Sequence, residues 1–289
     1  MEKHLFRFGG SMALVIPKAW AEKNVPGNKG MVYISENQFG NLLISARVNV
    51  RKENETVINS KTKVSFLTKL VDAYHLYGVR KIRIYSADHL TKDQIAGIVN
   101  KINRKCSGFE ITSQSKNDLV IEDFTDLKEI DVDKILLRLR SLINQELNEL
   151  SNGQPVAIEE VENLVDRFYR LGVRYLYITQ AKDALRYFRV LQLLETIGDQ
   201  LYTLSSNPKI QKSGIFDELA EQFDKSFSGF QGDDTAIESS EEMKDTFLKK
   251  LPSHKLDGAS LYILKELSIN MSKVANFGLR IDPEITGTL

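Results

Sequence analysis

The fold of the chain is decided by residues 131–151, DVDKILLRLRSLINQELNELS. Apolar residues recur there three and four positions apart, which is the period of a helix with one buried face. They are Ile135, Leu136, Leu139, Leu142, Ile143, Leu147 and Leu150. Five further helices are predicted at 157–181, 183–206, 208–227, 236–251 and 256–281. The short polar connectors between these segments predict antiparallel neighbours in an all-α bundle.

The sequence before this bundle has a different pattern. Residues 1–57 are typical of short strands and tight turns, with a short helix that begins behind Pro17. Residues 60–125 alternate helical and strand patterns, with helices expected at 64–78 and 91–105 and strands at 80–86, 109–113 and 118–124. We therefore predict an α+β multidomain protein with three domains: a β module (1–57), a small α/β unit (58–128) and a helical bundle (129–289).

Three local predictions accompany this division. Gly78 follows the first helix of the α/β unit and is a plausible C-cap, because glycine adopts the left-handed conformation without strain. Thr91 precedes the second helix and is a plausible N-cap. The stretch SFSGFQGDDTAIESS, residues 226–240, is the best candidate for a mobile loop.

Composition excludes several classes of protein. A single cysteine, Cys106, rules out an internal disulfide, and the four scattered histidines argue against a histidine-rich zinc site. We find no glycine-rich phosphate loop, nucleophile elbow or Cys–His pair, so an enzyme is not expected. No apolar stretch is long enough to span a membrane, which predicts a cytoplasmic protein without membrane insertion.

Charge is balanced overall but unevenly placed. The chain has 39 Lys and Arg residues and 39 Asp and Glu residues. Residues 1–57 carry eight basic residues against five acidic ones, a net +3, whereas residues 207–257 carry seven against eleven, a net −4. A four-stranded module of this size encloses little core, so we expect it to dimerise and thereby to double its basic patch.

The N-terminal module resembles the SpoVT/AbrB family. The resemblance is carried by residues 9–20, GGSMALVIPKAW, and by NVPGNKGMVYIS and GNLLIS further on, and it covers residues 1–48. It implies a swapped-hairpin homodimer formed through residues 1–48 that binds duplex DNA. The candidate DNA-binding residues are Arg7, Lys18 and Lys23, with Ser11 as a donor to phosphate in the turn.

Two pairs of acidic residues stand one helical turn apart in the bundle. Glu162 and Asp166 lie on the second predicted helix, and Glu195 and Asp199 lie on the third. If the two helices are antiparallel neighbours, the four carboxylates form a site for a hard cation. The alternative is that all four face solvent. Gly198, between the second pair, is expected to let a backbone or a hydrated ion approach closely.

The segment LETIGDQ, residues 194–200, resembles the helix signature of the PhoU family. The resemblance covers about residues 131–281 and implies two three-helix repeats with acidic motifs that bind metal, such as Fe, Mn, Zn or Mg. In the second copy Glu266 matches the motif, but Asn270 replaces the expected aspartate, so we do not expect a second metal site there.

Together these features resemble archaeal-type phosphate-uptake regulators. The resemblance implies a cytoplasmic, DNA-binding transcriptional regulator of phosphate uptake and homeostasis, with phosphate-transport or phosphate-sensing proteins as further partners. Two alternatives stay open at this point. One is a PhoU-type protein-interaction regulator that does not bind DNA, and the other is a carboxylate-metal phosphohydrolase.

Overall fold

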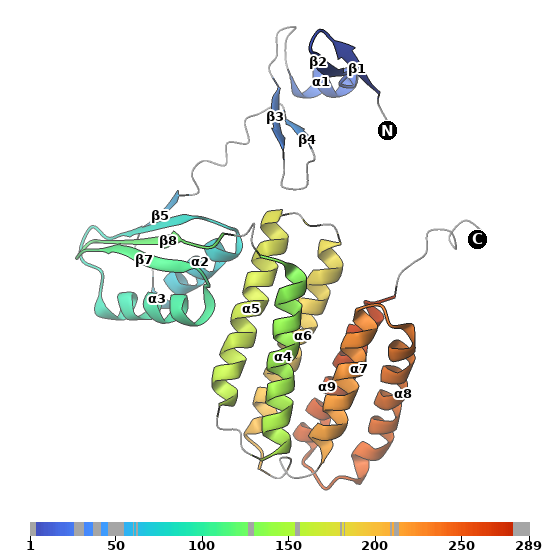
Figure 1. Cartoon of the computed structure of the whole chain (residues 1–289). Coiled ribbons are helices and arrows are strands. Elements are labelled where there is room, and N and C mark those ends of the chain that lie inside the picture. The colour runs from blue at the N-terminus through green and yellow to red at the C-terminus, as the bar shows by residue number, and fades with distance from the viewer. Residues whose placement is uncertain are drawn as a thin grey trace. The chain divides into compact units, whose positions relative to one another are not determined.

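The chain is a mixed α+β protein with a small β-rich N-terminal region and a helical C-terminal region (Figure 1). The computed structural model describes residues 4–25, 32–36, 42–45, 55–59, 61, 63–126, 130–153, 157–179, 181, 183–208, 210 and 214–279. The chain divides into two compact units, Met1–Glu53 and Asn54–Leu289.

The first unit contains two hairpins and one short helix. Strand β1 (Leu5–Phe8) pairs antiparallel with β2 (Ser11–Leu14) across the turn at Gly9, whose φ of 61° suits glycine. Helix α1 (Lys18–Asn24) begins directly after Pro17, and β3 (Tyr33–Glu36) pairs antiparallel with β4 (Leu42–Ser45). The strands and the short helix predicted for this region are confirmed.

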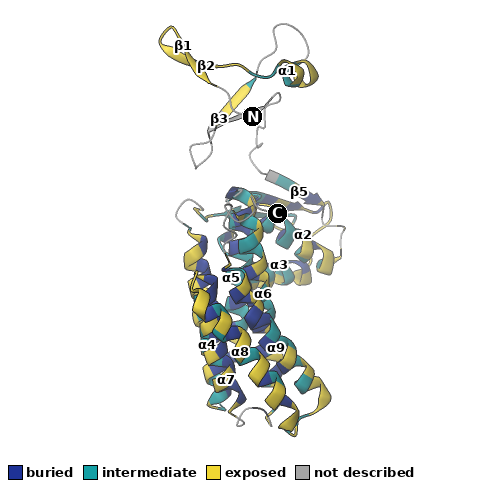
Figure 2. Ribbon diagram, turned by 90° about the vertical axis from the view of Figure 1, so that its right-hand side faces the viewer, coloured by how far each residue is buried: buried dark blue, intermediate teal, exposed yellow. Residues whose placement is uncertain are grey.

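The described residues of the first unit include none that is buried (Figure 2). Many of its large apolar side chains are exposed instead: Leu5, Phe6, Phe8, Met12, Leu14, Val15, Tyr33, Ile34 and Leu42. An apolar surface of this extent is typical of a protein interface rather than of a solvated face.

The second unit begins with a four-stranded sheet of order β5-β6-β8-β7. Its strands are β5 (Glu55–Asn59), β6 (Lys81–Tyr85), β7 (Phe109–Gln114) and β8 (Asp118–Asp123). Strands β5 and β6 are parallel and are joined through helix α2 (Val64–Leu76), whereas the other pairs are antiparallel. Strand β5 was not predicted, and it places residues 55–57, which we assigned to the N-terminal module, in the sheet of the second unit.

Both predicted helix caps of the α/β unit are present. Thr91 caps helix α3 (Lys92–Lys105) in a reciprocal capping box with Gln94. Gly78 follows the C-cap of α2 with a φ of 73°. A Cβ at Gly78 would also lie 2.4 Å from Ile178 Cδ1, so a larger residue would have to displace that side chain.

The six predicted helices of the bundle are all present. They are α4 (Val132–Ser151), α5 (Ile158–Thr179), α6 (Ala184–Ser205), α7 (Ile215–Phe230), α8 (Asp234–Lys250) and α9 (Gly258–Asn276). Helices α4, α5 and α6 pack as one group and α7, α8 and α9 as another, and the groups meet along α4 with α7 and α6 with α9 (Figure 1). The apolar stripe predicted for α4 is buried in this core.

The prediction of a mobile loop at 226–240 is wrong. Helix α7 continues to Phe230 and α8 begins at Asp234, which leaves only a tight turn between them. The reason is burial. Phe227 and Phe230 belong to the apolar core, and the hydroxyl oxygens of Ser226 and Ser240 lie 2.7 Å apart in a buried hydrogen bond between the two helices. Serine and glycine in this stretch serve close helix packing.

A buried ion pair joins the α/β sheet to the helical bundle. The guanidinium of Arg174, on α5, contacts the carboxylate of Asp123, the last residue of β8, and the two side chains are 1% and 3% exposed. The same guanidinium lies 5.5 Å from the ring centre of Phe109. The edge-on contact between Phe109 and His75 extends this junction into α2.

We expect Arg174→Met to lower the free energy of unfolding by about 3–5 kcal/mol, because it leaves the Asp123 carboxylate buried without a counter-charge. Adding Asp123→Asn should restore most of that loss, since the buried charge is then removed. Urea unfolding measures both, with Arg189→Met at an exposed position as the control. A loss below about 1 kcal/mol for Arg174→Met would show that the pair does not hold the junction.

Candidate functional site

The structure brings the two predicted acidic pairs together. Glu162 and Asp166 lie on α5, Glu195 and Asp199 lie on α6, and these helices pack against each other. Burial raises the pKa of Glu195 to about 7, and the charges of Asp199 and Asp166 add to that effect. Burial likewise raises the pKa of Glu162, with further contributions from Asp166 and Asp199. The four carboxylates therefore share one electrostatic environment.

A fifth carboxylate, Glu146 on α4, was missed by the sequence analysis. Its side chain is fully buried, and neither carboxylate oxygen has a hydrogen-bond partner in the described part of the chain. Burial raises its pKa to about 9, with added repulsion from Glu162, Glu149 and Asp199. Glu146 is therefore protonated at neutral pH. A signal was present, because Glu146 lies within the apolar stripe of α4, between Ile143 and Leu147.

We call Glu146, Glu162, Asp166, Glu195 and Asp199 the carboxylate cluster. The three helices α4, α5 and α6 each supply at least one member. The cluster runs from the fully buried Glu146 to Asp199, which is exposed at the protein surface. Glu162 and Glu195 are half-buried and Asp166 is buried, so solvent access falls from Asp199 towards Glu146.

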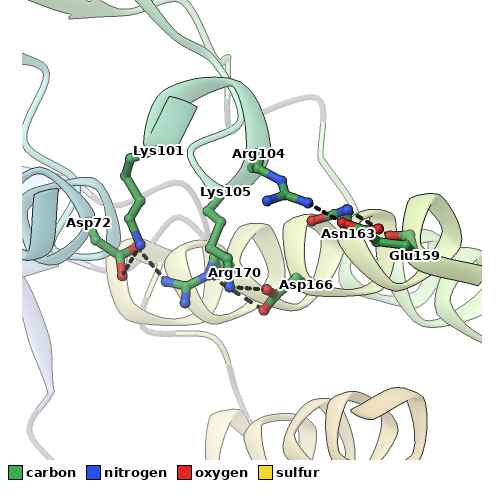
Figure 3. Close-up of polar contacts among 8 residues, drawn as sticks. All are labelled: Asp72, Lys101, Arg104, Lys105, Glu159, Asn163, Asp166 and Arg170. Carbon is green, nitrogen blue, oxygen red and sulfur yellow. Dashed lines mark hydrogen bonds and ion pairs between the residues drawn. The ribbon is translucent and has the colours of Figure 1, made fainter. Parts of the chain in front are cut away.

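Basic side chains from the α/β unit reach one member of this cluster. Figure 3 shows Lys105, the last residue of α3, pointing at Asp166 on α5, and the two form an ion pair. Asp166 is also 3.7 Å from Arg170 Nε, and Arg170 in turn contacts Asp72 on α2. Lys101 Nζ lies 3.8 Å from the same Asp72. Sequence spacing within the bundle indicates Arg170, four residues after Asp166 on α5, but could not reveal Lys105, because that residue comes from another part of the fold.

Gly198 has a packing role that differs from the expected one. A Cβ at this position would lie 3.0 Å from Cγ1 of Val165. The close approach is thus made by a valine side chain of α5, and no backbone or ion is needed to explain the glycine. The glycine lets α5 and α6 come close enough for their acidic residues to interact.

The corresponding position in the second helix group lacks an acidic pair. Asn270 is buried, donates to Gln200 Oε1 at 3.4 Å and accepts from Lys273 Nζ at 3.3 Å. An amide engaged with a lysine is a poor ligand for a cation. Within the described ranges, no three or more His, Cys, Asp or Glu side chains have the arrangement of a metal site. Metal binding at Glu162, Asp166, Glu195 and Asp199 therefore stays a prediction.

The candidate DNA-binding residues lie on three elements of the first unit, β1, β2 and α1. Arg7 pairs with Met12 and Ser11 pairs with Phe8, which places Arg7 and Ser11 on opposite faces of the hairpin. Lys18 begins α1 and lies 3.7 Å from Glu22, while Lys23 is in its last turn. The hairpin therefore does not present Arg7 and Ser11 to one phosphate on a single face.

Comparisons of the chain with protein-family models, with curated proteins and with solved structures give no match. None of the described helices combines the length and the apolar character that crossing a membrane requires. The two family resemblances of the sequence stay predictions.

We expect Glu146→Gln to stabilise the protein at neutral pH in the presence of a chelator. The folded pKa of about 9 lies above the ordinary value of 4.5, so the folded state holds a proton that the unfolded state has lost. The wild type therefore loses stability as pH rises from 4.5 to 9, by about 3 kcal/mol at pH 7, and the glutamine variant does not.

Urea unfolding at several pH values measures this difference. The two proteins should be equally stable near pH 4 and should diverge above it. Glu160→Gln, at an exposed position of α5, is the control and should change stability by less than about 0.5 kcal/mol. A glutamine variant less stable than the wild type at pH 7 would show that the ionised carboxylate has a cationic partner.

Proposed function

We propose that this chain is a DNA-binding transcriptional regulator that acts as a homodimer and responds to a cation through the carboxylate cluster of its helical body. The proposal rests on two features that occur together in this chain. The basic first unit has no buried residue among those described, and the second unit gathers five carboxylates around one buried, unpartnered glutamate.

Dimerisation is supported by the exposed apolar side chains of the first unit. Phe8, Met12 and Ile34 are 74%, 61% and 62% exposed in the single chain. Two-stranded hairpins are marginal in water on their own and need a covered apolar face. A second copy of the same unit supplies such a cover by two-fold symmetry.

DNA binding is supported by charge and exposure. The first 57 residues carry a net +3, which a dimer doubles. Arg7, Ser11, Lys18 and Lys23 lie on the hairpin and on α1, where they are open to a phosphate backbone. The pair between Lys18 and Glu22 is highly exposed and gives way easily to a phosphate.

The cation-responsive role is supported by the electrostatics of the cluster. Partial burial raises the pKa of Glu162, Glu195 and Asp199 above their ordinary values, and repulsion among the carboxylates adds to that effect. A divalent or trivalent cation bound to oxygen ligands would relieve this repulsion. The link to phosphate uptake rests on the PhoU resemblance of residues 194–200, and the cytoplasmic setting belongs to the same proposal.

We expect a chain shortened to residues 54–289 to be monomeric in light scattering, because it lacks the apolar surface of the first unit. The truncation keeps β5 paired with β6, so the sheet of the second unit stays whole. In the full chain, Phe8→Ser should weaken the dimer, whereas Leu137→Ser, at an exposed apolar position of α4, should not. A dimer of residues 54–289 would show that the helical body makes the main interface instead.

We expect the full chain to bind duplex DNA with a steep salt dependence, since phosphate contacts release counterions. Arg7→Ala/Lys18→Ala should weaken binding and flatten the slope of log K against log salt by about one unit per lost phosphate contact. Gel shifts between low and moderate salt measure this, with Lys134→Ala on α4 as the control. Unchanged affinity in the double variant would remove both residues from the interface.

A further inference from the structure

Lys105 has a singular position in the second unit. It ends α3, its side chain is 32% exposed, and its ammonium contacts Asp166, whose side chain is only 8% exposed. Its charge also lowers the pKa of Glu162, Glu195 and Asp199, so it lies near every outer member of the carboxylate cluster. The protein thus places one of its own cations where a bound metal ion is expected.

The charges of the cluster are not balanced by this lysine. In the described part of the chain, no basic side chain forms an ion pair with Glu162, Glu195 or Asp199. Arg170 is 3.7 Å from Asp166, but its closer partner is Asp72. The fully buried Glu146 has no hydrogen-bond partner there either, which points to a polar or charged occupant beside it. The cluster therefore attracts a further cation, and the ammonium of Lys105 competes with that cation for Asp166.

We propose that Lys105 is a tethered counter-cation that a divalent metal ion displaces from Asp166, so that metal binding releases the end of α3 from α5. This inference rests on the cation site proposed above and describes how cation binding at that site changes the contact between α3 and α5. The ammonium contacts one oxygen of the Asp166 carboxylate, and it repels a metal ion bound to the same carboxylate, so each cation weakens the binding of the other.

The remaining ties decide how far the release extends. Arg104 on α3 contacts Glu159 on α5 at 2.9 Å, but both side chains are about half exposed or more, so this pair holds α3 weakly (Figure 3). The buried pair between Arg174 and Asp123 is remote from α3 in the chain and holds the sheet instead. Lys101, one turn earlier on α3, stays linked through Asp72 to Arg170 of α5. Displacement of Lys105 therefore loosens only the last turn of α3 while the sheet stays docked on the bundle.

The test compares manganese binding by the full-length wild type, Lys105→Met and Arg104→Met in calorimetry. Methionine keeps the apolar stem of lysine and removes its charge. We expect Lys105→Met to bind manganese about tenfold more tightly than the wild type, since the competing ammonium is gone, and Arg104→Met to stay within about twofold. Lys105→Gln, a polar and neutral replacement, should reproduce the tightening if Lys105→Met folds poorly.

Hydrogen exchange gives the second measurement. Manganese should speed amide exchange at the C-terminal end of α3 in the wild type, and in Lys105→Met exchange there should be fast without metal and unchanged by it. Binding to Lys105→Met and Lys105→Gln that is no tighter than wild-type binding would overturn the inference and leave the cation site standing. If neither the wild type nor these variants bind manganese, or if Glu195→Gln/Asp199→Asn leaves binding intact, both the site and the inference fail.

Discussion

The buried ion pair between Arg174 and Asp123 fixes the geometry on which the second unit depends. It joins α5, the helix that carries Glu162 and Asp166, to the end of β8 in the sheet. With the sheet held there, α3 lies against α5 and Lys105 reaches Asp166. A buried pair of this kind is costly to desolvate and costly to break singly, so it specifies one docking geometry more than it adds stability.

The carboxylate cluster follows from close helix packing. Gly198 lets α6 approach Val165 of α5, and this approach brings four outer carboxylates into one field. The inner member, Glu146, sits on the buried face of α4 and is protonated at neutral pH because burial opposes its ionisation. The repulsion between carboxylates is thus confined to the group of α4, α5 and α6. In the group of α7, α8 and α9 the equivalent position holds the neutral side chain of Asn270.

Much of the local structure was predictable because it follows from periodicity and from capping chemistry. The helical bundle, the capping box at Thr91 and the glycine after α2 all appear as expected. The prediction of a loop at 226–240 was wrong because serine and glycine are common both in turns and in close contacts between helices. Composition alone does not distinguish these two settings. Strand β5 was missed because a five-residue edge strand has too short a pattern to identify alone.

The fold class, the six helices of the bundle and the residues of the two acidic pairs could all be predicted from the sequence, because each depends on spacing within one segment. The interaction of these pairs with Glu146, and the contact of the Lys105 ammonium with Asp166, could be found only from the packing of the folded chain. The physical reason is that charges interact through space. Lys105 and Asp166 are far apart in the chain, and no local pattern encodes the packing of α3 on α5 that brings them into contact.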